Sequence, residues 1–374
     1  MMITKPLGLY VHVPFCVRKC NYCDFCSFPI ENINCREEYI DELCREIFSY
    51  KKKNISIDSI FFGGGTPSLL TEEEFERITF AIKDSFDVLA DCEFTLEANP
   101  KTLDKKKLDK YISCGVNRIS IGLQSIHENE QKILGRIHDF DDFLESFHLA
   151  RDSGINNINV DLMYGIPEQA SESFKKTLES VVSLSPEHIS LYSLILEEGT
   201  PFFDNAESLA LPDEDSDCDM YYIAAGYLRD KHYKHYEISN YAKPGFECRH
   251  NLKYWRDEEF IGVGVSAYSY FCGSRYGNSR KLDEYLSESK ANYVVSERID
   301  DTSREFEYVM LRLRLAEGLS LTDYEAKFGK DFYIGRERKI DELCMAGLLV
   351  VSDGRIMLTE RGFYVSNFIL TELL

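Results

Sequence analysis

Residues 10–26 decide the fold and read Tyr-Val-His-Val-Pro-Phe-Cys-Val-Arg-Lys-Cys-Asn-Tyr-Cys-Asp-Phe-Cys. Within them Cys16, Cys20 and Cys23 form a C-x3-C-x2-C pattern, directly after an apolar run, Leu7 to Val13, that predicts a buried strand. A loop at the carboxyl end of a barrel strand is where such folds carry their chemistry. Three thiolates this close in sequence can hold one face of an iron–sulfur cluster and leave one iron open.

Two alternatives remain for this loop on spacing alone. Structural zinc takes four ligands, and Cys26 offers a fourth thiol nearby. The cysteines could also be buried free thiols. Spacing favours the cluster, because zinc ligands usually come as two separated pairs.

Composition narrows the classes of function. The chain has 374 residues, and 44% of them are hydrophobic, which is enough for a sizeable core. The formal charge of −21 argues against a nucleic-acid partner and against anionic membrane surfaces. Twelve cysteines without a secretion signal or a membrane-spanning run predict reduced thiols in a cytoplasmic protein.

Strands alternate with helices through the first 200 residues. The first expected strand is Leu7 to Val13, and the later ones cover residues 57–62, 93–97, 118–122, 157–161 and 188–193. Helical patterns separate them; the helix that follows residues 63–68 begins with a capping box at Thr71. This order predicts an α/β fold, a parallel sheet closed partly or fully into a six-stranded barrel.

Polar side chains recur where the expected strands end. They are Glu97, Gln124 and Asp161, with Arg136 a little further along, and Gly63 to Ser68 follows the second strand. One such residue is more often a helix cap or a satisfied core group. A set at the same topological position indicates a ligand site at the carboxyl ends of the strands.

Two later stretches stand apart from this alternation. Residues 240–259 contain His250 and the only tryptophan, Trp255, and their Pro-Gly and polar content predicts a loop with aromatics against a flat partner. From Thr302 onward, helices and a hairpin turning at Asp353-Gly354 predict a small winged-helix-like α+β domain. Its acids equal or exceed its bases, which favours packing or substrate covering over DNA binding. We therefore expect three parts, 1–200, 201–300 and 301–374.

Several motifs in order carry a resemblance to a known family. The cysteine run with Tyr22 resembles the radical S-adenosylmethionine (SAM) enzymes. Over nearly its whole length the chain resembles the HemW branch of the oxygen-independent coproporphyrinogen III oxidase family. The motifs that carry this second resemblance are Gly63-Gly-Gly-Thr-Pro-Ser-Leu69, Leu96-Glu-Ala-Asn-Pro100, Asn117 to Gln124, Leu134-Gly-Arg-Ile-His138, Asp161 to Pro167 and His250-Asn-Leu-Lys-Tyr-Trp255.

The resemblance implies a partial (β/α)6 radical SAM barrel with three bound groups: a 4Fe–4S cluster, SAM and heme. It implies that Cys16, Cys20 and Cys23 hold the cluster and that SAM binds its open iron. It implies that His250 contributes to heme binding, as an axial ligand or a near neighbour. The SAM pocket would be formed by Tyr10, Tyr22, Gly64, Gly65, Thr66, Glu97, Gln124, Arg136 and Asp161.

Two departures bear on function. The family's decarboxylating oxidase has a fourth cysteine two residues after its third ligand, where this chain has Phe25, with Cys26 one residue later. Tyr268 stands where many HemW members have histidine, so this chain cannot ligate heme through a histidine at that position. Phe25 and the His250-Asn-Leu-Lys-Tyr-Trp255 run favour a chaperone that lacks coproporphyrinogen III oxidase activity over the oxidase itself, or over an enzyme that opens or methylates heme.

The chaperone interpretation also predicts partners. They are a heme-accepting protein, an electron donor where SAM is cleaved, and room for a weakly bound partner on the membrane side. The oligomeric state is left open.

Overall fold

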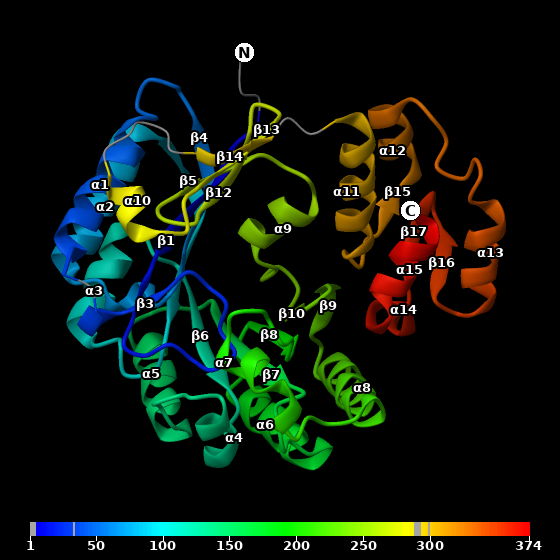
Figure 1. Ribbon diagram of the computed structural model, residues 1–374, viewed down its shortest axis with the longest axis horizontal. Helices are drawn as coiled ribbons and strands as arrows, with labels where there is room; N and C mark the ends of the chain where they lie inside the picture. The colour runs from blue at the N-terminus through cyan, green and yellow to red at the C-terminus, as the bar shows by residue number, and fades with distance from the viewer. Residues whose placement is uncertain (1–4, 33, 288–292, 298–299) are drawn as a thin grey trace.

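A computed structural model describes residues 5–32, 34–287, 293–297 and 300–374. Its main feature is a twelve-stranded sheet with the strand order β14-β13-β12-β11-β1-β4-β5-β6-β7-β8-β10-β9 (Figure 1). The sheet curves but has two separate edges, at β14 and β9, so the barrel is open.

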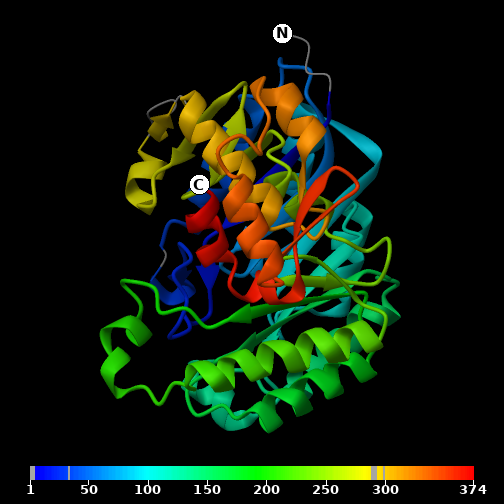
Figure 2. The same ribbon diagram turned by 90° about the vertical axis from the view of Figure 1, so that its right-hand side faces the viewer.

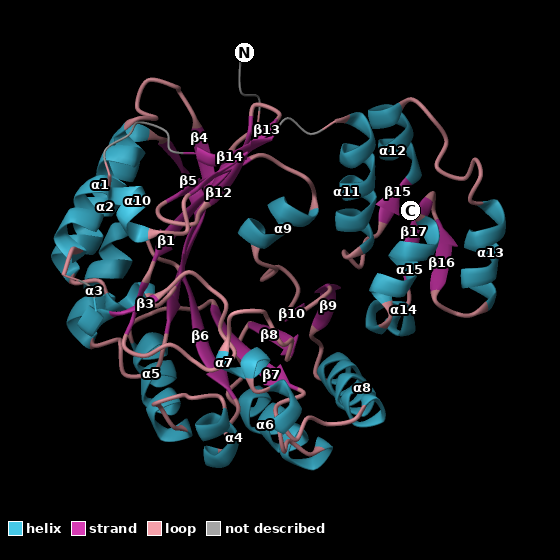
Figure 3. Cartoon of the chain, in the orientation of Figure 1, coloured by secondary structure: helices cyan, strands magenta, loops and turns pink. Residues whose placement is uncertain are grey.

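Six central strands are parallel and confirm the predicted (β/α)6 alternation. They are β1 (Leu7–Val13), β4 (Ser56–Gly64), β5 (Asp87–Ala98), β6 (Arg118–Gln124), β7 (Ile158–Tyr164) and β8 (His188–Ser193). Helices cover the outer face of this curved sheet (Figure 3). They are α1 (Arg36–Phe48), α2 (Glu72–Ser85), α3 (Lys105–Cys114), α4 (Glu128–Ile133), α5 (Phe140–Asp152), α6 (Ser171–Ser183) and α8 (Glu214–Asp230). The sequence had not predicted α8.

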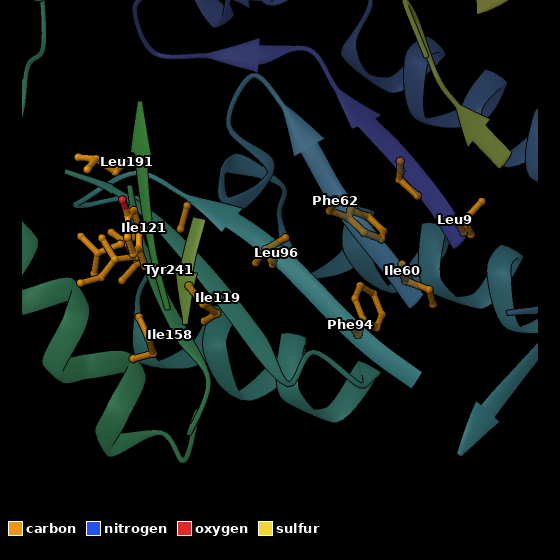
Figure 4. Close-up of a cluster of buried hydrophobic side chains, with 14 of the residues drawn as sticks. Leu9, Ile60, Phe62, Phe94, Leu96, Ile119, Ile121, Ile158, Leu191 and Tyr241 are labelled. Atoms are coloured by element: carbon orange, nitrogen blue, oxygen red, sulfur yellow. The ribbon is translucent and has the colours of Figure 1, made fainter. Parts of the chain in front are cut away.

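The central strands are buried on both faces, which explains their nearly continuous apolar runs. Leu9 of β1, Phe62 of β4 and Leu96 of β5 are fully buried, and Figure 4 shows them in the cluster of hydrophobic side chains that pack against the sheet. On the other half of the sheet Ile119, Ile158 and Leu191 continue the same core. This packing fixes the strands so that their carboxyl ends share one rim.

The segment after residue 200 extends the sheet at both edges. One edge gains the antiparallel β10 and β9, and the other gains β11, parallel to β1, followed by an antiparallel β12–β13–β14 meander. The elements of this segment are α7 (Pro201–Asp204), β9 (Lys234–Glu237), β10 (Asn240–Ala242), α9 (Arg249–Trp255), β11 (Phe260–Val263), β12 (Tyr268–Phe271), β13 (Ser274–Asn278), α10 (Leu282–Leu286) and β14 (Tyr293–Glu297).

The expectation of a loop over residues 240–259 was wrong in part. The stretch begins with β10 and contains α9, which carries the chain from one edge of the sheet to the other on its inner side (Figure 1). The helix forms because Glu93 of β5 caps it: its carboxylate accepts hydrogen bonds from the N–H groups of Arg249 and His250, both at 3.1 Å. A cap more than 150 positions away leaves no local sequence signal.

The C-terminal part has the predicted winged-helix-like order of elements. It consists of α11 (Asp301–Leu313), β15 (Leu319–Ser320), α12 (Leu321–Phe328), α13 (Glu337–Met345), β16 (Leu349–Ser352), β17 (Arg355–Leu358), α14 (Glu360–Tyr364) and α15 (Ser366–Leu373). The hairpin turns at Asp353 and Gly354, which have φ of 52° and 71° as its tight turn requires.

Main-chain hydrogen bonds join this domain to β9. The N–H of Ala316 donates to Tyr236 O at 3.0 Å, and the N–H of Ile238 donates to Arg314 O at 2.9 Å. Figure 2 shows the domain from the side that faces away from the barrel. Among the helices of the described residues, none is both long enough and apolar enough to cross a membrane.

Candidate functional site

The cysteine loop is anchored at both ends and in its middle. It begins at β2 (Phe15–Cys16), which pairs with β3 (Phe28–Pro29). Asn21, between the second and third cysteines, donates from its main chain to Leu134 O at 3.0 Å and from its side chain to Ile133 O at 2.9 Å. The sequence analysis did not single out Asn21, although it lies inside the cysteine motif.

A cavity at the carboxyl rim, here called the cysteine cavity, brings together all the predicted site residues except Tyr10 and His250. Its predicted members are Cys16, Cys20, Tyr22, Cys23, Gly64, Gly65, Thr66, Glu97, Gln124, Arg136 and Asp161. They come from the cysteine loop, from β4 to β7 and from the segment after α4. The juxtaposition is the one expected if strand ends share a rim.

The cysteine cavity is small, and its thiols are partly buried. It measures about 140 Å³. Within the described residues no group of three or more His, Cys, Asp or Glu side chains is already arranged to hold a metal ion. Burial raises the pKa of Cys23 to about 11, so ligation has to displace a proton from this thiol.

The turn from Gly63 to Ser68, here called the glycine turn, has no space for a side chain at Gly64 or Gly65. A Cβ on Gly65 would lie 2.7 Å from Phe15 O. The N–H of Gly65 donates to Val13 O at 2.8 Å. Gly64 has φ of 111°, and a Cβ there would lie 2.5 Å from the His12 ring. The turn is thus pressed against β1 and the start of the cysteine loop, which holds that loop over the rim.

A chain of hydrogen bonds connects the turn with a cysteine. Asn99 donates to Thr66 Oγ1 at 2.9 Å, and Thr66 Oγ1 lies 3.6 Å from Cys16 Sγ. Because Thr66 already accepts one hydrogen bond, its own hydroxyl proton can point at the sulfur. Asn99 also accepts from Arg136 Nη2 at 3.2 Å. Asn99 was missed as a site residue, although it stands in the quoted Glu-Ala-Asn-Pro motif.

Arg136 has hydrogen-bonding capacity left for a ligand. Its Nη2 donates to Gly122 O at 2.5 Å, whereas its buried Nε makes no hydrogen bond within the described part of the chain. Buried donors without a partner are rare, and this one belongs to a residue that lines the cysteine cavity, where a ligand can reach it. A carboxylate such as that of SAM fits this donor.

Two carboxyl groups, on β5 and β7 at either side of β6, face the same cavity. Glu97 Oε2 accepts from the N–H of Gly64 at 3.2 Å, and burial together with the Asp161 charge raises the pKa of Glu97 to about 8. Asp161 accepts from Asn159 at 2.7 Å and from Ser120 at 3.1 Å, and burial raises its pKa too. Two buried carboxyl groups disfavour each other's ionisation. A cationic ligand would stabilise both as anions, so this part of the cavity favours a cation.

Gln124 completes the rim under backbone strain. It ends β6 with φ of 72°, next to a register shift between β6 and β7. A non-glycine residue in this conformation is uncommon and often marks a binding site.

Tyr10 lies on the wall of a second, larger cavity. Its hydroxyl is 3.0 Å from His12 Nδ1, and His12 Nε2 is 2.7 Å from Cys26 O. Because a carbonyl only accepts, His12 donates from Nε2 and receives the Tyr10 proton at Nδ1. Tyr10 therefore faces the neighbouring cavity with its hydroxyl committed to His12.

His250 lies inside the barrel and is 1% exposed. Its Nδ1 is 3.1 Å from Ser59 Oγ, its Nε2 is 2.7 Å from Tyr254 Oη, and its ring stacks on Phe61 at 5.4 Å. Both ring nitrogens are thus engaged by the protein. Tyr254, in contrast, lines the second cavity. Of the two roles predicted for His250, the geometry suits the near neighbour, acting through Tyr254.

Comparisons with known proteins agree with this architecture. The Radical SAM superfamily pattern matches residues 10–181, and the HemN C-terminal domain pattern matches residues 299–365. The chain is 35% identical to the heme chaperone HemW of Lactococcus lactis, covering 100% of this chain and 98% of that one. It is 34% identical to the heme chaperone HemW of Escherichia coli, covering 99% and 98%.

One solved structure shares the whole fold. The coproporphyrinogen III oxidase HemN of Escherichia coli, described as a radical SAM enzyme, superimposes with a TM-score of 0.86 over 98% of this chain and 90% of that one, at 24% identity. Fold and rim residues define a radical SAM protein. Within that class, full-length identity above 30% shows that the chain belongs to the HemW family.

Proposed function

We propose that this protein is a heme carrier that holds a 4Fe–4S cluster and SAM and passes heme to an acceptor protein. The observation that carries the proposal is the cysteine cavity, where three thiols, two carboxyls and an unsatisfied arginine donor meet at one rim. The HemW relatives are named heme chaperones, which supports heme as the molecule that is carried. All twelve cysteines are free thiols, which fits a reducing cytoplasm.

Each rim residue has a definite task in this proposal. Cys16, Cys20 and Cys23 supply three thiolates to a cluster that leaves one iron for SAM. Arg136 Nε donates to the SAM carboxylate, and Glu97 and Asp161 stabilise its positive charge. A bound cluster would supply the electron for cleaving SAM, and an external electron donor is then needed as a partner.

The three parts of the chain divide these tasks. We assign the cluster and SAM to residues 1–200, heme to residues 201–300 together with the adjoining cysteine loop, and a covering role to residues 301–374. Leu311 of the C-terminal part lines the second cavity, as a cover would.

Heme titration tests the proposal. Protein with its cluster reconstituted anaerobically is titrated with hemin, with and without SAM, and a saturable Soret band at one heme per chain is expected. Triple replacement of Cys16, Cys20 and Cys23 by Ala should abolish cluster and SAM binding. Absence of a saturable band contradicts the carrier function. Conversion of coproporphyrinogen III to protoporphyrinogen would favour the oxidase instead.

A further inference from the structure

A second cavity, here called the aromatic cavity, lies beside the cysteine loop. It measures about 520 Å³, within the ~300–1,000 Å³ usual for pockets that enclose organic ligands. Its aromatic lining is Tyr10, Phe25, Tyr254, Phe260, Tyr268 and Tyr270. The wall combines β1, the cysteine loop, α9, β12 and, through Leu311, the C-terminal domain. Such a wall suits a flat apolar ring.

One cation at this cavity is available for an anionic ligand. Arg280 donates to Asp24 O at 2.9 Å and has no carboxylate partner among the described residues. Arg275 also lines the cavity, but it is paired with Glu307 at 2.6 Å. The acids nearby are Asp24, Asp257 and Glu258, of which Asp257 pairs with Lys327 and Glu258 with Lys253. A macrocycle with carboxylate arms at one edge matches flat aromatics with one available arginine.

Most atoms around the cavity that could ligate heme iron are occupied. Both nitrogens of His12 are engaged, and Tyr10 donates to one of them. The Tyr254 hydroxyl is bonded to His250, and Cys26 Sγ donates to Arg280 O at 3.2 Å. Tyr270 is 7% exposed, and the Arg275 Cζ lies over its ring, 5.8 Å from the centre of the Tyr270 ring.

Tyr268 differs from these groups. Half of its surface is exposed, and its hydroxyl makes no hydrogen bond to any described residue. Its ring is nevertheless held in place, because it lies over its cross-strand partner Gly277, where a Cβ would come within 2.7 Å of two ring carbons. A phenolate oxygen is an established ligand of heme iron.

We propose that heme binds in the aromatic cavity with the Tyr268 phenolate as an axial ligand of ferric iron and a propionate on Arg280. The inference rests on the heme-carrying function proposed above and assigns its site. On binding, the Tyr268 hydroxyl loses its proton to solvent, its oxygen forms a bond to iron, and a water leaves the metal. The iron remains ferric, so no electron is transferred.

Spectroscopy of heme-loaded variants tests the ligand. In Tyr268→Phe the phenolate-to-iron charge-transfer absorption should disappear, and heme affinity should fall about tenfold, which corresponds to ~1.4 kcal/mol. In Tyr268→His a new nitrogen ligand should move the Soret maximum and change the spin state seen by electron paramagnetic resonance. Tyr227→Phe, on α8 away from the cavity, is the matched control and should behave as wild type.

Two further variants test the geometry. Gly277→Ala should displace the Tyr268 ring and weaken heme binding, whereas Arg280→Ala should weaken binding without moving the Soret maximum. The inference is overturned if wild type binds heme and Tyr268→Phe keeps the same spectrum and affinity, or if Cys26→Ser alone changes the ligand signature. If wild type binds no heme, it is the carrier function itself that fails.

Discussion

The four cysteines of the loop differ in what their thiols face. Cys16, Cys20 and Cys23 line the cysteine cavity, while Cys26 is turned to the aromatic cavity and donates to Arg280 O. We therefore expect Cys26→Ala to retain the cluster and Cys20→Ala to lose it. Iron and sulfide content after anaerobic reconstitution, with the visible absorption, measures this. If both variants lose the cluster equally, Cys26 is also a ligand and the site has four thiols.

Glu97 gives SAM binding a pH dependence with a definite sign. Its pKa is raised to about 8, first by burial and then by Asp161 on β7, whereas the Gly64 N–H and Arg118 of β6 act in the opposite direction. Below this pH the carboxyl is neutral and cannot stabilise a cation. SAM affinity should therefore rise between about pH 6.5 and about pH 8.5, by less than tenfold per unit.

Calorimetric titration of cluster-loaded protein across that range checks the prediction. Glu97→Gln keeps the shape of the side chain and should flatten the profile, with affinity near the low-pH value of wild type. A pH profile in Glu97→Gln as steep as in wild type would place the titrating group elsewhere.

Sequence reasoning identified the rim residues because a strand end followed by a polar residue is a local pattern. It missed Asn21 and Asn99, whose importance lies in partners more than 30 residues away, Ile133 and Thr66. For the same reason it could not distinguish a ligand from a neighbour at His250, since its partners Ser59 and Phe61 come from β4, far away in the sequence.

At the scale of elements, α9 couples the barrel interior to the aromatic cavity. His250 holds Tyr254 through a 2.7 Å hydrogen bond, and Tyr254 forms part of the cavity wall. We expect His250→Ala to weaken heme binding without moving the Soret maximum and to lower the free energy of unfolding by about 2–4 kcal/mol, through the lost bond and the space left behind.

Tyr254→Phe is the matched control for α9, because it removes only the hydroxyl. It should reproduce the weaker heme binding with a smaller loss of stability in urea unfolding. A shifted Soret maximum in His250→Ala would instead make the histidine an axial ligand, which would require α9 to leave its buried position.

The cysteine loop itself separates the two cavities. Phe25 lines both of them and is 61% exposed. A SAM-dependent movement of the loop should therefore reach heme. We expect saturating SAM to change the heme dissociation constant by at least about fivefold, the lower end of common coupling energies.

Replacing the shared side chain tests this coupling. In Phe25→Ala the ratio of heme dissociation constants with and without SAM should approach one. Phe80→Ala, on the outer helix α2 and 64% exposed, should leave the ratio as in wild type. A ratio of one already in wild type would mean that the cavities act independently.

At the scale of the whole molecule, the parallel core and the C-terminal domain could be predicted, because alternating apolar runs and a tight Asp-Gly turn are local signals. The extension of the sheet at both edges could not. Strands β9 and β10 are short. Strand β10 pairs with β8, β9 is bonded to the C-terminal domain, and α9 is capped by Glu93 of β5. Long-range pairing of this kind leaves little trace in sequence.

Buried ionisable groups spread through the molecule make folding stability depend on pH. Burial lowers the pKa of His12, His138 and His235 from 6.5 to about 4, and that of His250 to about 3. At these histidines the unfolded chain binds more protons than the folded chain between about pH 4 and pH 6.5, so they make stability rise with pH over that range.

Buried carboxyls with raised pKa values, among them Glu97 and Glu237, act in the opposite direction between about pH 4.5 and pH 8. The pKa of Glu97 and of Glu237 is raised from 4.5 to about 8 by burial, so the folded chain keeps protons that the unfolded chain has lost. Above pH 6.5 the histidines no longer contribute, so stability should fall as pH rises from 6.5 toward 8. Urea unfolding at a series of pH values measures the curve.

Glu237→Gln isolates the alkaline side of the curve. Glu237 is fully buried in β9, where the C-terminal domain joins the barrel, and it accepts a hydrogen bond from the N–H of Ser239 at 3.2 Å. The amide cannot ionise, so the variant should lose less stability than wild type between pH 6.5 and pH 8 while keeping the acid limb, which depends on the histidines. If Glu237→Gln loses as much stability as wild type between pH 6.5 and pH 8, Glu237 does not give up its proton in this interval and the slope comes from other groups.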